Sequence, residues 1–368
     1  MNKQRIYLSP PNLVGNEYQK ISDVLDSGWI APVGKAIDEF ENQLAASYEN
    51  KAVVALNSGT SALHLALILS GVGKGDHVLI SSFTFAACAN VVLYQSANPI
   101  FIDSETQTWN LDPDLLEAYL KKAKKIPKAI IVTHLYGMPA QIDRVCSIAK
   151  EYGIIVIEDA AEALGSTFND QYVGGFGEFG VLSFNGNKII TTSAGGALIC
   201  REQDRKRAVY LATQANSGTL GYDHMEVGYN YRMSNVLAGL GVAQHEHLSD
   251  FISRKRAIHT RYQERLSEHF DFLAEPVGCF SNRWLTTATL RDSNRNIEEL
   301  IQFLDGQNIE TRRLWKPLHL HQAYSGYPFI GDKVAEDLFN RGICLPSGTG
   351  LPIEDQDFVI DKIKNWLS

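Results

Sequence analysis

The sequence predicts an α/β fold with a large, mostly parallel sheet covered by helices and a smaller C-terminal α/β domain. Two observations predict the sheet. Between residues 53 and 200, short apolar runs alternate with helical stretches. The runs are apolar at nearly every position, which is typical of strands buried on both faces of a parallel sheet. The chain of 368 residues is also long enough for two domains.

The expected strands and helices follow one another in a regular order. The apolar runs are VVAL (53–56), HVLIS (77–81), PIFID (99–103), AIIVTHLYG (129–137) and IIVIEDAAEALGS (154–166). The helical stretches between them are SALHLALILSGV, AACANVVLYQSA, LDPDLLEAYLKKAKK and DRVCSIAKEYG. Asp112 is the expected N-cap of the third helix because it directly precedes Pro113. In sheets of this kind, ligands bind outside the carboxyl ends of the strands.

The last third of the chain is expected to form the second domain. A helical stretch from about Ser234 to Phe270 is rich in charged residues around apolar ones, and we expect it to leave the large domain. Three later segments predict a small α/β domain: WLTTATL (284–290), IEELIQFLDGQNI (297–309) and an amphipathic stretch near 353–367. The predicted large domain, with its N-terminal arm, is residues 1–245, and the small domain is residues 246–368.

The composition argues against several classes of protein. The net charge is −8 and there is no basic block, so nucleic acid is not expected as the main partner. Five scattered cysteines without CxxC spacing are typical of reduced thiols, and we expect a cytoplasmic protein. The N-terminus lacks the apolar core of a signal peptide, and no apolar run approaches the ~20 residues of a membrane span. The histidines show no metal-ligand spacing, so no metal site is expected.

Lys188 is the only charged residue between Glu178 and Arg201, in the run SFNGNKIITTSAGG (183–196). Loss of water lowers the pKa of a lysine, and the neutral amine can attack a carbonyl and form a Schiff base. Two alternatives stay open for this stretch alone. The stem of the lysine could lie on apolar surface with its head in water, or the ammonium could bind a phosphate as a point charge.

The segment NSGTSALHLAL (57–67) places Ser58, Gly59 and Thr60 between a strand and a helix. Exposed backbone N–H groups and the positive end of the helix dipole make this turn a candidate anion site. Thr60 or Ser61 is then expected to be both the helix cap and a phosphate ligand. A plain capped turn is the alternative, and taken alone it is the more common case.

Two acids, Glu158 and Asp159, end the run IIVIED. An anion below a pyridine ring keeps the ring nitrogen protonated, and the ring then acts as an electron sink. An acid pair that caps the next helix is the alternative. His134 and Tyr136 follow AIIVT and are expected at the same edge of the sheet, with Tyr136 interpreted as an ordinary wall residue.

Taken together, these elements match what pyridoxal phosphate needs from a protein. The turn at residues 58–60 holds the phosphate, and Phe85 in SSFTFAA covers one face of the ring. Asp159 pairs with the ring nitrogen, and Lys188 forms the Schiff base. The sequence therefore predicts a site for pyridoxal 5'-phosphate.

At this point the chain resembles the DegT/StrS family of nucleotide-sugar aminotransferases, which have the aspartate-aminotransferase fold (fold type I of pyridoxal phosphate enzymes). The resemblance is carried by GWIAPVGKAIDEFE (28–41), LNSGTSALHLAL, SSFTFAA, FIDSE, THLYG, IEDAAEALGS, SFNGNKIITTSAGG, GYNYRMSN (228–235), RRLWKPLH (312–319) and CLPSG (344–348). Within the family, LSPPN, FNGNKIITTS and ICLPSG look most like the enzymes that make UDP-4-amino-4,6-dideoxy-N-acetylglucosamine, an intermediate toward bacillosamine.

The resemblance implies roles for individual residues. Lys188 matches the Schiff-base lysine, Asp159 the partner of the ring nitrogen, and Phe85 the ring-stacking position. Contacts near the cofactor phosphate match Ser58, Gly59, Thr60 and Ser183. Asn230 matches a residue that reaches the phosphate from the other subunit, which implies a homodimer with shared active sites. Glu162 stands where Gln or His often lies near the ring hydroxyl, so a carboxylate there must accept a proton or contact another group.

The resemblance also implies substrate contacts and a reaction. The substrate-binding positions are Gly28, Trp29, Ile30 and Ala31 beside the sugar, and Arg312, Trp315 and His319 in a variable region. The implied enzyme moves the amino group of L-glutamate to C4 of a UDP-4-keto-6-deoxy-N-acetylhexosamine. Alternatives are a GDP-perosamine-type or dTDP-4-amino-6-deoxy-sugar aminotransferase, and a non-catalytic relative that senses a ligand. A sugar 3-dehydratase of this fold has histidine in place of the lysine, so Lys188 argues against it.

Overall fold

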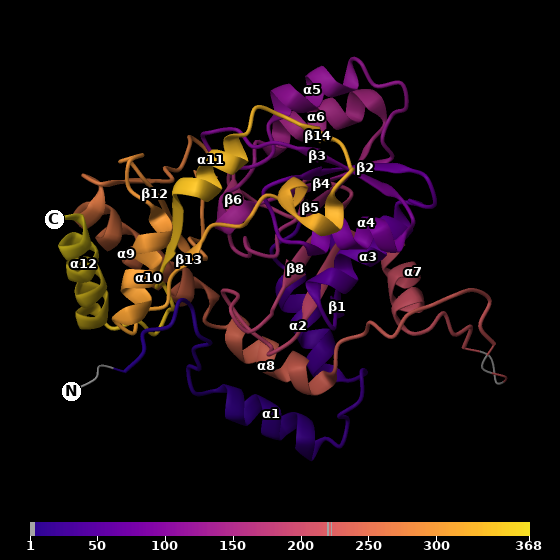
Figure 1. Ribbon diagram of the computed structural model, residues 1–368. Coiled ribbons are helices and arrows are strands. Elements are labelled where there is room, and N and C mark those ends of the chain that lie inside the picture. The colour runs from indigo at the N-terminus through magenta and orange to yellow at the C-terminus, as the bar shows by residue number, and fades with distance from the viewer. Residues whose placement is uncertain (1–3, 219–220, 222) are drawn as a thin grey trace.

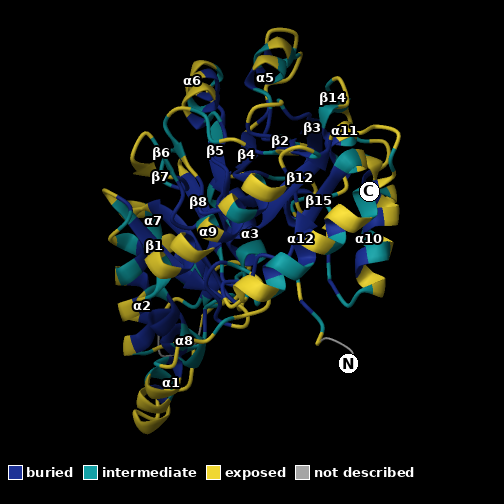
Figure 2. Ribbon diagram, turned by 90° about the vertical axis from the view of Figure 1, so that its left-hand side faces the viewer, coloured by how far each residue is buried: buried dark blue, intermediate teal, exposed yellow. Residues whose placement is uncertain are grey.

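The computed structural model describes residues 4–218, 221 and 223–368, and it contains two α/β parts that lie side by side (Figure 1). The large part surrounds an eight-stranded sheet, and the C-terminal part surrounds a four-stranded sheet. The central strands of both sheets are buried, while exposed residues lie mainly on the outer faces of the helices and in loops (Figure 2). In the described part of the chain, no helix is both long enough and apolar enough to cross a membrane.

The large sheet has the strand order β1-β9-β8-β5-β4-β2-β3-β14. Its strands are β1 (Lys51–Leu56), β2 (His77–Ser81), β3 (Asn98–Ile102), β4 (Ala129–Thr133), β5 (Ile155–Asp159), β8 (Phe179–Ser183), β9 (Gly196–Arg201) and β14 (Phe329–Ile330). Neighbouring strands from β8 to β14 pair in parallel, whereas β9 is antiparallel to both β8 and β1. The prediction of a mostly parallel sheet is confirmed. The exception arises because no helix follows β8, and a parallel return needs a long crossover.

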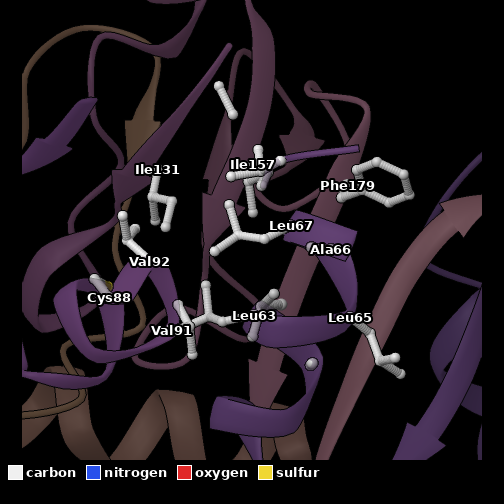
Figure 3. Packing of buried hydrophobic residues seen from close by; sticks show 14 of the residues in the cluster. Leu63, Leu65, Ala66, Leu67, Cys88, Val91, Val92, Ile131, Ile157 and Phe179 are labelled. Carbon is white, nitrogen blue, oxygen red and sulfur yellow. The ribbon is translucent and has the colours of Figure 1, made fainter. Parts of the chain in front are cut away.

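Helices cover both faces of this sheet, as expected for buried parallel strands. They are α2 (Lys35–Ala45), α3 (Gly59–Leu69), α4 (Ala87–Tyr94), α5 (Pro113–Leu120), α6 (Ile142–Tyr152), α7 (Glu202–Ala212) and α8 (Asn235–His245), and α1 (Glu17–Asp26) packs on the outer side of α8. Alternate residues of β4 show the division: Ile131 packs with α3 and α4, whereas Ile130 packs with α5 and α6. Figure 3 shows Leu67 of α3 beside Ile157 of β5, and Leu63 of α3 beside Val91 of α4.

Asp112 caps α5 as predicted, because its Oδ1 accepts hydrogen bonds from the N–H groups of Asp114 and Leu115 at 2.7 and 3.4 Å. The helical stretch expected over 234–270 is two helices, α8 and α9 (Leu248–Leu266). They separate because α8 packs into the core of the large part, whereas α9 packs into the core of the C-terminal part. The predicted domain boundary at residues 245 and 246 falls at this break.

The C-terminal part has an antiparallel sheet of order β10-β12-β15-β13. Its elements are β10 (Phe270–Phe272), β12 (Thr286–Leu290), β13 (Arg312–Arg313), β15 (Gly342–Leu345), α9, α10 (Ile297–Gly306), α11 (Val334–Arg341) and α12 (Ile353–Leu367). A small third sheet joins β11 (Cys279–Phe280), β6 (Thr167–Phe168) and β7 (Gln171–Tyr172). Short 3-10 turns are η1 (Leu135–Gly137), η2 (Leu318–Leu320) and η3 (Gln322–Tyr324). Strand β14 returns to pair with β3, so the chain crosses between the two parts again after residue 246.

Lys255 on α9 connects this helix to the N-terminal segment and to the residues just before β12. Its side chain is 2% exposed, and its Nζ donates to Ser9 Oγ at 2.9 Å and to the Trp284 carbonyl at 2.8 Å. Both partners are neutral, so the cost of burying the ammonium is not offset by an opposite charge. Burial therefore lowers the pKa of Lys255 to about 7.

This lowered pKa predicts a pH-dependent stability. Above about pH 7 the folded chain loses the Lys255 proton, whereas the unfolded chain keeps it up to about pH 10. Stability therefore rises with pH across this interval, by about 1.4 kcal/mol per pH unit for one proton. Denaturant unfolding at about pH 7 and about pH 9 should show this gain in the wild type and in Lys128→Met, an exposed control. Lys255→Met should lack the gain, and equal slopes for all three proteins would contradict the assignment.

Candidate active site

A cavity of about 280 Å³ opens at the edge of the large sheet where the parallel strands end. Segments that follow β1, β2, β5 and β8 line it, together with Thr133 at the end of β4 and the residues just before β9. The predicted site residues that line it are Ser58, Gly59, Thr60, Phe85, Asp159, Glu162, Ser183, Lys188 and Trp315. These positions are far apart in the sequence and meet because parallel strands place their carboxyl ends at one edge.

Lys188 lies in the connection between β8 and β9, and its side chain is 13% exposed. Its Nζ is 3.6 Å from Glu162 Oε1 and 4.0 Å from the centre of the Trp284 ring. The Trp284 Nε1 donates to the carbonyl of Asn187 at 2.7 Å, which fixes the indole against the neighbour of the lysine. The head of Lys188 is therefore enclosed between a carboxylate and a ring face, and it does not extend into bulk water.

The first turn of α3 forms one end of the cavity. Ser58, not Thr60 or Ser61, is the N-cap, because its Oγ accepts from the Ser61 N–H at 3.1 Å. The expectation of Thr60 or Ser61 as cap is wrong, since both residues already lie inside the helix. Gly59 and Thr60 thus present their backbone N–H groups in the first turn, where the helix dipole favours an anion.

Close packing behind this turn leaves no room for side chains. A Cβ on Gly59 would lie 3.1 Å from the Cβ of Ser183, and one on Gly196 would lie 2.3 Å from the Gly59 nitrogen. The strands β8 and β9 therefore support the turn directly with backbone. Ser183 ends β8 next to Gly59 and lines the same end of the cavity.

Only one acid of the predicted pair reaches the cavity, because successive strand residues point to opposite faces. Asp159 lines it, with Oδ1 accepting from the Ala161 N–H at 3.1 Å and Oδ2 accepting from the Cys88 thiol at 3.0 Å. Burial, with the neighbouring Asp159, raises the pKa of the Cys88 thiol well above its usual range, so the group stays a donor. Glu158 is fully buried behind the sheet edge and accepts from His134 Nε2 at 2.9 Å.

The Glu162 carboxylate contacts protein groups of the cavity wall. Its Oε2 accepts from the Tyr136 N–H at 2.7 Å, and its Oε1 accepts from Trp315 Nε1 at 3.3 Å and faces Lys188. Burial raises the pKa of Glu162, although Lys188 opposes the shift. Trp315 also approaches Phe85, with ring centres 5.3 Å apart.

Several predicted site residues lie outside this cavity. Asn230 is exposed, and it meets the cavity wall only through its carbonyl, which accepts from Asn57 Nδ2 at 3.0 Å. In the exposed segment 28–31, Trp29 lines a separate cavity of about 590 Å³ among α1, α2 and α8. Arg312 lines a third cavity of about 410 Å³, which shares Trp315 with the first.

His319 also lies outside the cavity and joins the two parts of the chain. Its Nδ1 is 2.6 Å from Ser82 Oγ, its Nε2 is 3.3 Å from Glu336 Oε1, and its ring stacks on Phe329. Trp284, which the sequence reasoning placed only in a strand, lines the cavity beside Lys188. No local motif marks it, because its partner is about a hundred residues earlier in the chain. Within the described ranges, no cluster of three or more His, Cys, Asp or Glu side chains could hold a metal ion.

Comparison with known families gives a clear match. The model of the DegT/DnrJ/EryC1/StrS aminotransferase family matches residues 11–364. The chain belongs to this aminotransferase family. Among curated relatives of this DegT-family chain, EpsN of Bacillus subtilis (strain 168), named as a pyridoxal phosphate-dependent aminotransferase, is 47% identical, with 99% of both chains covered. The GDP-perosamine synthase of Escherichia coli O157:H7 is 36% identical, with 97% of both covered.

Solved structures agree with the family assignment. A DegT DnrJ EryC1 StrS aminotransferase from Brucella abortus is 30% identical, with a TM-score of 0.89 and 95% of both chains covered. The PLP form of the sugar aminotransferase Spr1654 from Streptococcus pneumoniae is 28% identical, with a TM-score of 0.90 and 98% of both covered. The fold of this DegT-family chain is therefore aminotransferase fold type I, as predicted.

Pyridoxal phosphate is the cofactor of this family, and the cavity fits it. An anion-binding helix turn, a buried carboxylate and an enclosed lysine amine line one space of about 280 Å³. The glycines at 59 and 196 let β8 and β9 pack directly behind the backbone of the turn, which holds it at the end of the cavity. Phe85 and the two indoles supply apolar walls for a planar ring.

The packing of Gly196 gives a testable consequence for cofactor binding. Gly196→Ala should displace the first turn of α3, because the new Cβ would overlap the Gly59 nitrogen. We expect the dissociation constant for pyridoxal phosphate to rise by at least about tenfold, or about 1.4 kcal/mol. Gly186→Ala is the matched control, since that position is open and only two residues from Lys188. Absorbance titration measures both, and equal affinities would show that the turn does not depend on Gly196.

Proposed function

We propose that this chain is a nucleotide-sugar 4-aminotransferase. It moves the amino group of L-glutamate to C4 of a UDP-4-keto-6-deoxy-N-acetylhexosamine and gives UDP-4-amino-4,6-dideoxy-N-acetylglucosamine. The observation that carries the proposal is the enclosed Lys188 amine in one cavity with the Asp159 carboxylate and the anion-binding turn of α3. Family membership supports the aminotransferase class, and the bacillosamine-type motifs support the UDP sugar.

Each cavity residue has a task in this reaction. When bound, pyridoxal phosphate supplies an electron sink for the carbon that carries the amino group. Ser58, Gly59, Thr60 and Ser183 bind its phosphate, and Phe85 covers one face of its ring. Asp159 holds a proton at the ring nitrogen, with its own orientation set by the Cys88 thiol and the Ala161 N–H.

Lys188 is the proposed catalytic residue. It holds the cofactor covalently and, as a free amine, moves a proton at the reacting carbon as base and then as acid. Its position between Glu162 and Trp284 limits the volume that the amine samples, which favours proximity catalysis. The same amine serves the glutamate half-reaction and, in the reverse direction, the sugar half-reaction.

A homodimer with shared active sites is part of the proposal. Asn230 is exposed and lies outside the cavity of its own chain, so we assign the phosphate contact to Asn230 of the partner subunit. The described residues 213–218 and 223–227, which follow α7, extend away from the large part (Figure 1). They include Met225 and Val227, each 79% exposed, which are apolar side chains suited to a partner surface. The segment 28–31, with Trp29 60% exposed, is the proposed sugar contact at such an interface.

The proposed substrate contacts in the C-terminal part are Arg312, Trp315 and His319, of which Trp315 lines the main cavity. A GDP-perosamine-type reaction is the second candidate, supported by the E. coli GDP-perosamine synthase at 36% identity. A dTDP-sugar acceptor is a further alternative. A ligand sensor without catalysis would have no use for the enclosed lysine. The five free cysteines support a cytoplasmic location.

Replacement of the lysine tests the reaction class. Lys188→Ala should lose the visible absorbance of the cofactor-linked lysine and should lose turnover by several orders of magnitude. The melting temperature should stay close to that of the wild type, because Lys188 lies at the cavity and outside the apolar cores. Lys206→Ala, on the exposed surface of α7, is the control. Full activity of Lys188→Ala would exclude the mechanism.

A substrate screen tests the finer proposal. Purified UDP-, GDP- and dTDP-4-keto-6-deoxy sugars are incubated with the enzyme and L-glutamate, and mass spectrometry detects the amino sugar. We expect kcat/KM for the UDP-N-acetyl sugar to exceed the others by at least about tenfold, or about 1.4 kcal/mol. A preference for the GDP sugar would replace the UDP assignment with the perosamine-type reaction.

A further inference from the structure

Glu162 lies among three donors. Its Oε2 receives the Tyr136 backbone N–H, and its Oε1 receives Trp315 Nε1–H and lies 3.6 Å from the Lys188 ammonium. A carboxylate accepts at both oxygens, whereas a glutamine would turn an NH₂ group toward one of these donors. The residue type at position 162 therefore follows from its surroundings. The carboxylate links the lysine at the cavity to the indole of the C-terminal part.

Tyr136 connects Glu162 to Trp315 a second time, from behind the wall of the main cavity. Its hydroxyl oxygen accepts from the Trp315 backbone N–H at 2.8 Å. Its ring is nearly parallel to two indoles, 6.2 Å from Trp284 with planes 14° apart and 6.5 Å from Trp315 with planes 6° apart. Tyr136 is 3% exposed and is not among the residues that line the main cavity, whereas Glu162, Trp284 and Trp315 are.

The backbone at this turn is held in an uncommon conformation. Tyr136 has φ 53° and ψ 23°, in the left-handed region of backbone conformation that residues other than glycine rarely adopt. Gly137 follows with φ 86°, and a Cβ there would lie 1.9 Å from Asn282 Oδ1. Asn282 also receives the Trp284 N–H at 2.8 Å and donates to the Glu162 carbonyl at 3.0 Å. The turn thus aims the Tyr136 N–H at Glu162 and its hydroxyl at Trp315, at a cost in backbone strain.

We propose that Tyr136 is a positioning residue for the sugar acceptor, acting through Glu162 and Trp315. It holds the segment 312–319 at a fixed distance from Lys188, so that the C-terminal wall of the cavity is in place when the sugar binds. This inference rests on the proposed aminotransferase function. L-glutamate is small and fits beside Lys188, whereas the larger acceptor also needs the wall that Trp315 supplies.

The test is Tyr136→Phe, which removes the acceptor for the Trp315 N–H together with the hydroxyl's contact to the Cys344 thiol, and keeps both the ring contacts and the backbone bond to Glu162. The KM for the sugar acceptor should rise by about five- to tenfold, the size expected for one lost neutral hydrogen bond. The rate of the L-glutamate half-reaction, followed by absorbance without acceptor, should stay within about twofold. In cofactor-free protein, hydrogen exchange at the Trp315 amide should become about five- to tenfold faster.

Tyr262→Phe is the matched control, because Tyr262 is fully buried and its hydroxyl bonds to the Pro346 carbonyl at 3.0 Å, in the core of the C-terminal part. Tyr262→Phe should lower the melting temperature about as much as Tyr136→Phe does. It should leave the KM for the sugar acceptor and the hydrogen exchange of the Trp315 amide unchanged. Wild-type KM and exchange in Tyr136→Phe would overturn the inference, as would equal slowing of both half-reactions. If the wild type itself gives no L-glutamate half-reaction, the proposed function fails and not the positioning role.

Discussion

The enclosed position of the Lys188 amine is the constraint around which the site is arranged. A lysine ammonium held away from water is costly unless an opposite charge or a ring face compensates it. Here the large part supplies the Glu162 carboxylate at 3.6 Å and the C-terminal part supplies the Trp284 ring at 4.0 Å. Because the two neighbours come from different parts of the chain, the amine has its position only when both parts are docked. The cavity is therefore a property of the whole fold rather than of either sheet.

The large sheet explains why the remaining groups meet at this amine. Strands that run in parallel end at one edge, so the turn after β1, the acid at the end of β5 and the serine at the end of β8 face a common space. The antiparallel return of β9 adds a further constraint, since Gly196 lies against the nitrogen of Gly59. The strand that follows the Lys188 loop and the candidate anion-binding turn of α3 are thus held against each other by backbone packing.

The C-terminal part contributes aromatic side chains that complete the cavity wall. The rings of Trp284 and Trp315 both lie nearly parallel to that of Tyr136, and the strained turn at Tyr136 bonds to both Glu162 and the segment after β13. Lys255 adds a connection between the N-terminal segment and the Trp284 carbonyl. The wall therefore joins the segment after β13 to the part of the cavity that is built from the large sheet.

The sequence by itself determined the fold class, the order of the strands and helices, the cap at Asp112 and the set of residues at the strand ends, because these follow from local periodicity and turn chemistry. It could not determine that Ser58 rather than Thr60 caps α3, since one residue of shift is invisible to such patterns. Nor could it predict that Trp284 lies beside Lys188, that β14 pairs with β3, or that His319 bonds to Ser82 outside the cavity. Those relations join segments tens to hundreds of residues apart. They depend on how two packed parts dock, which no local pattern encodes.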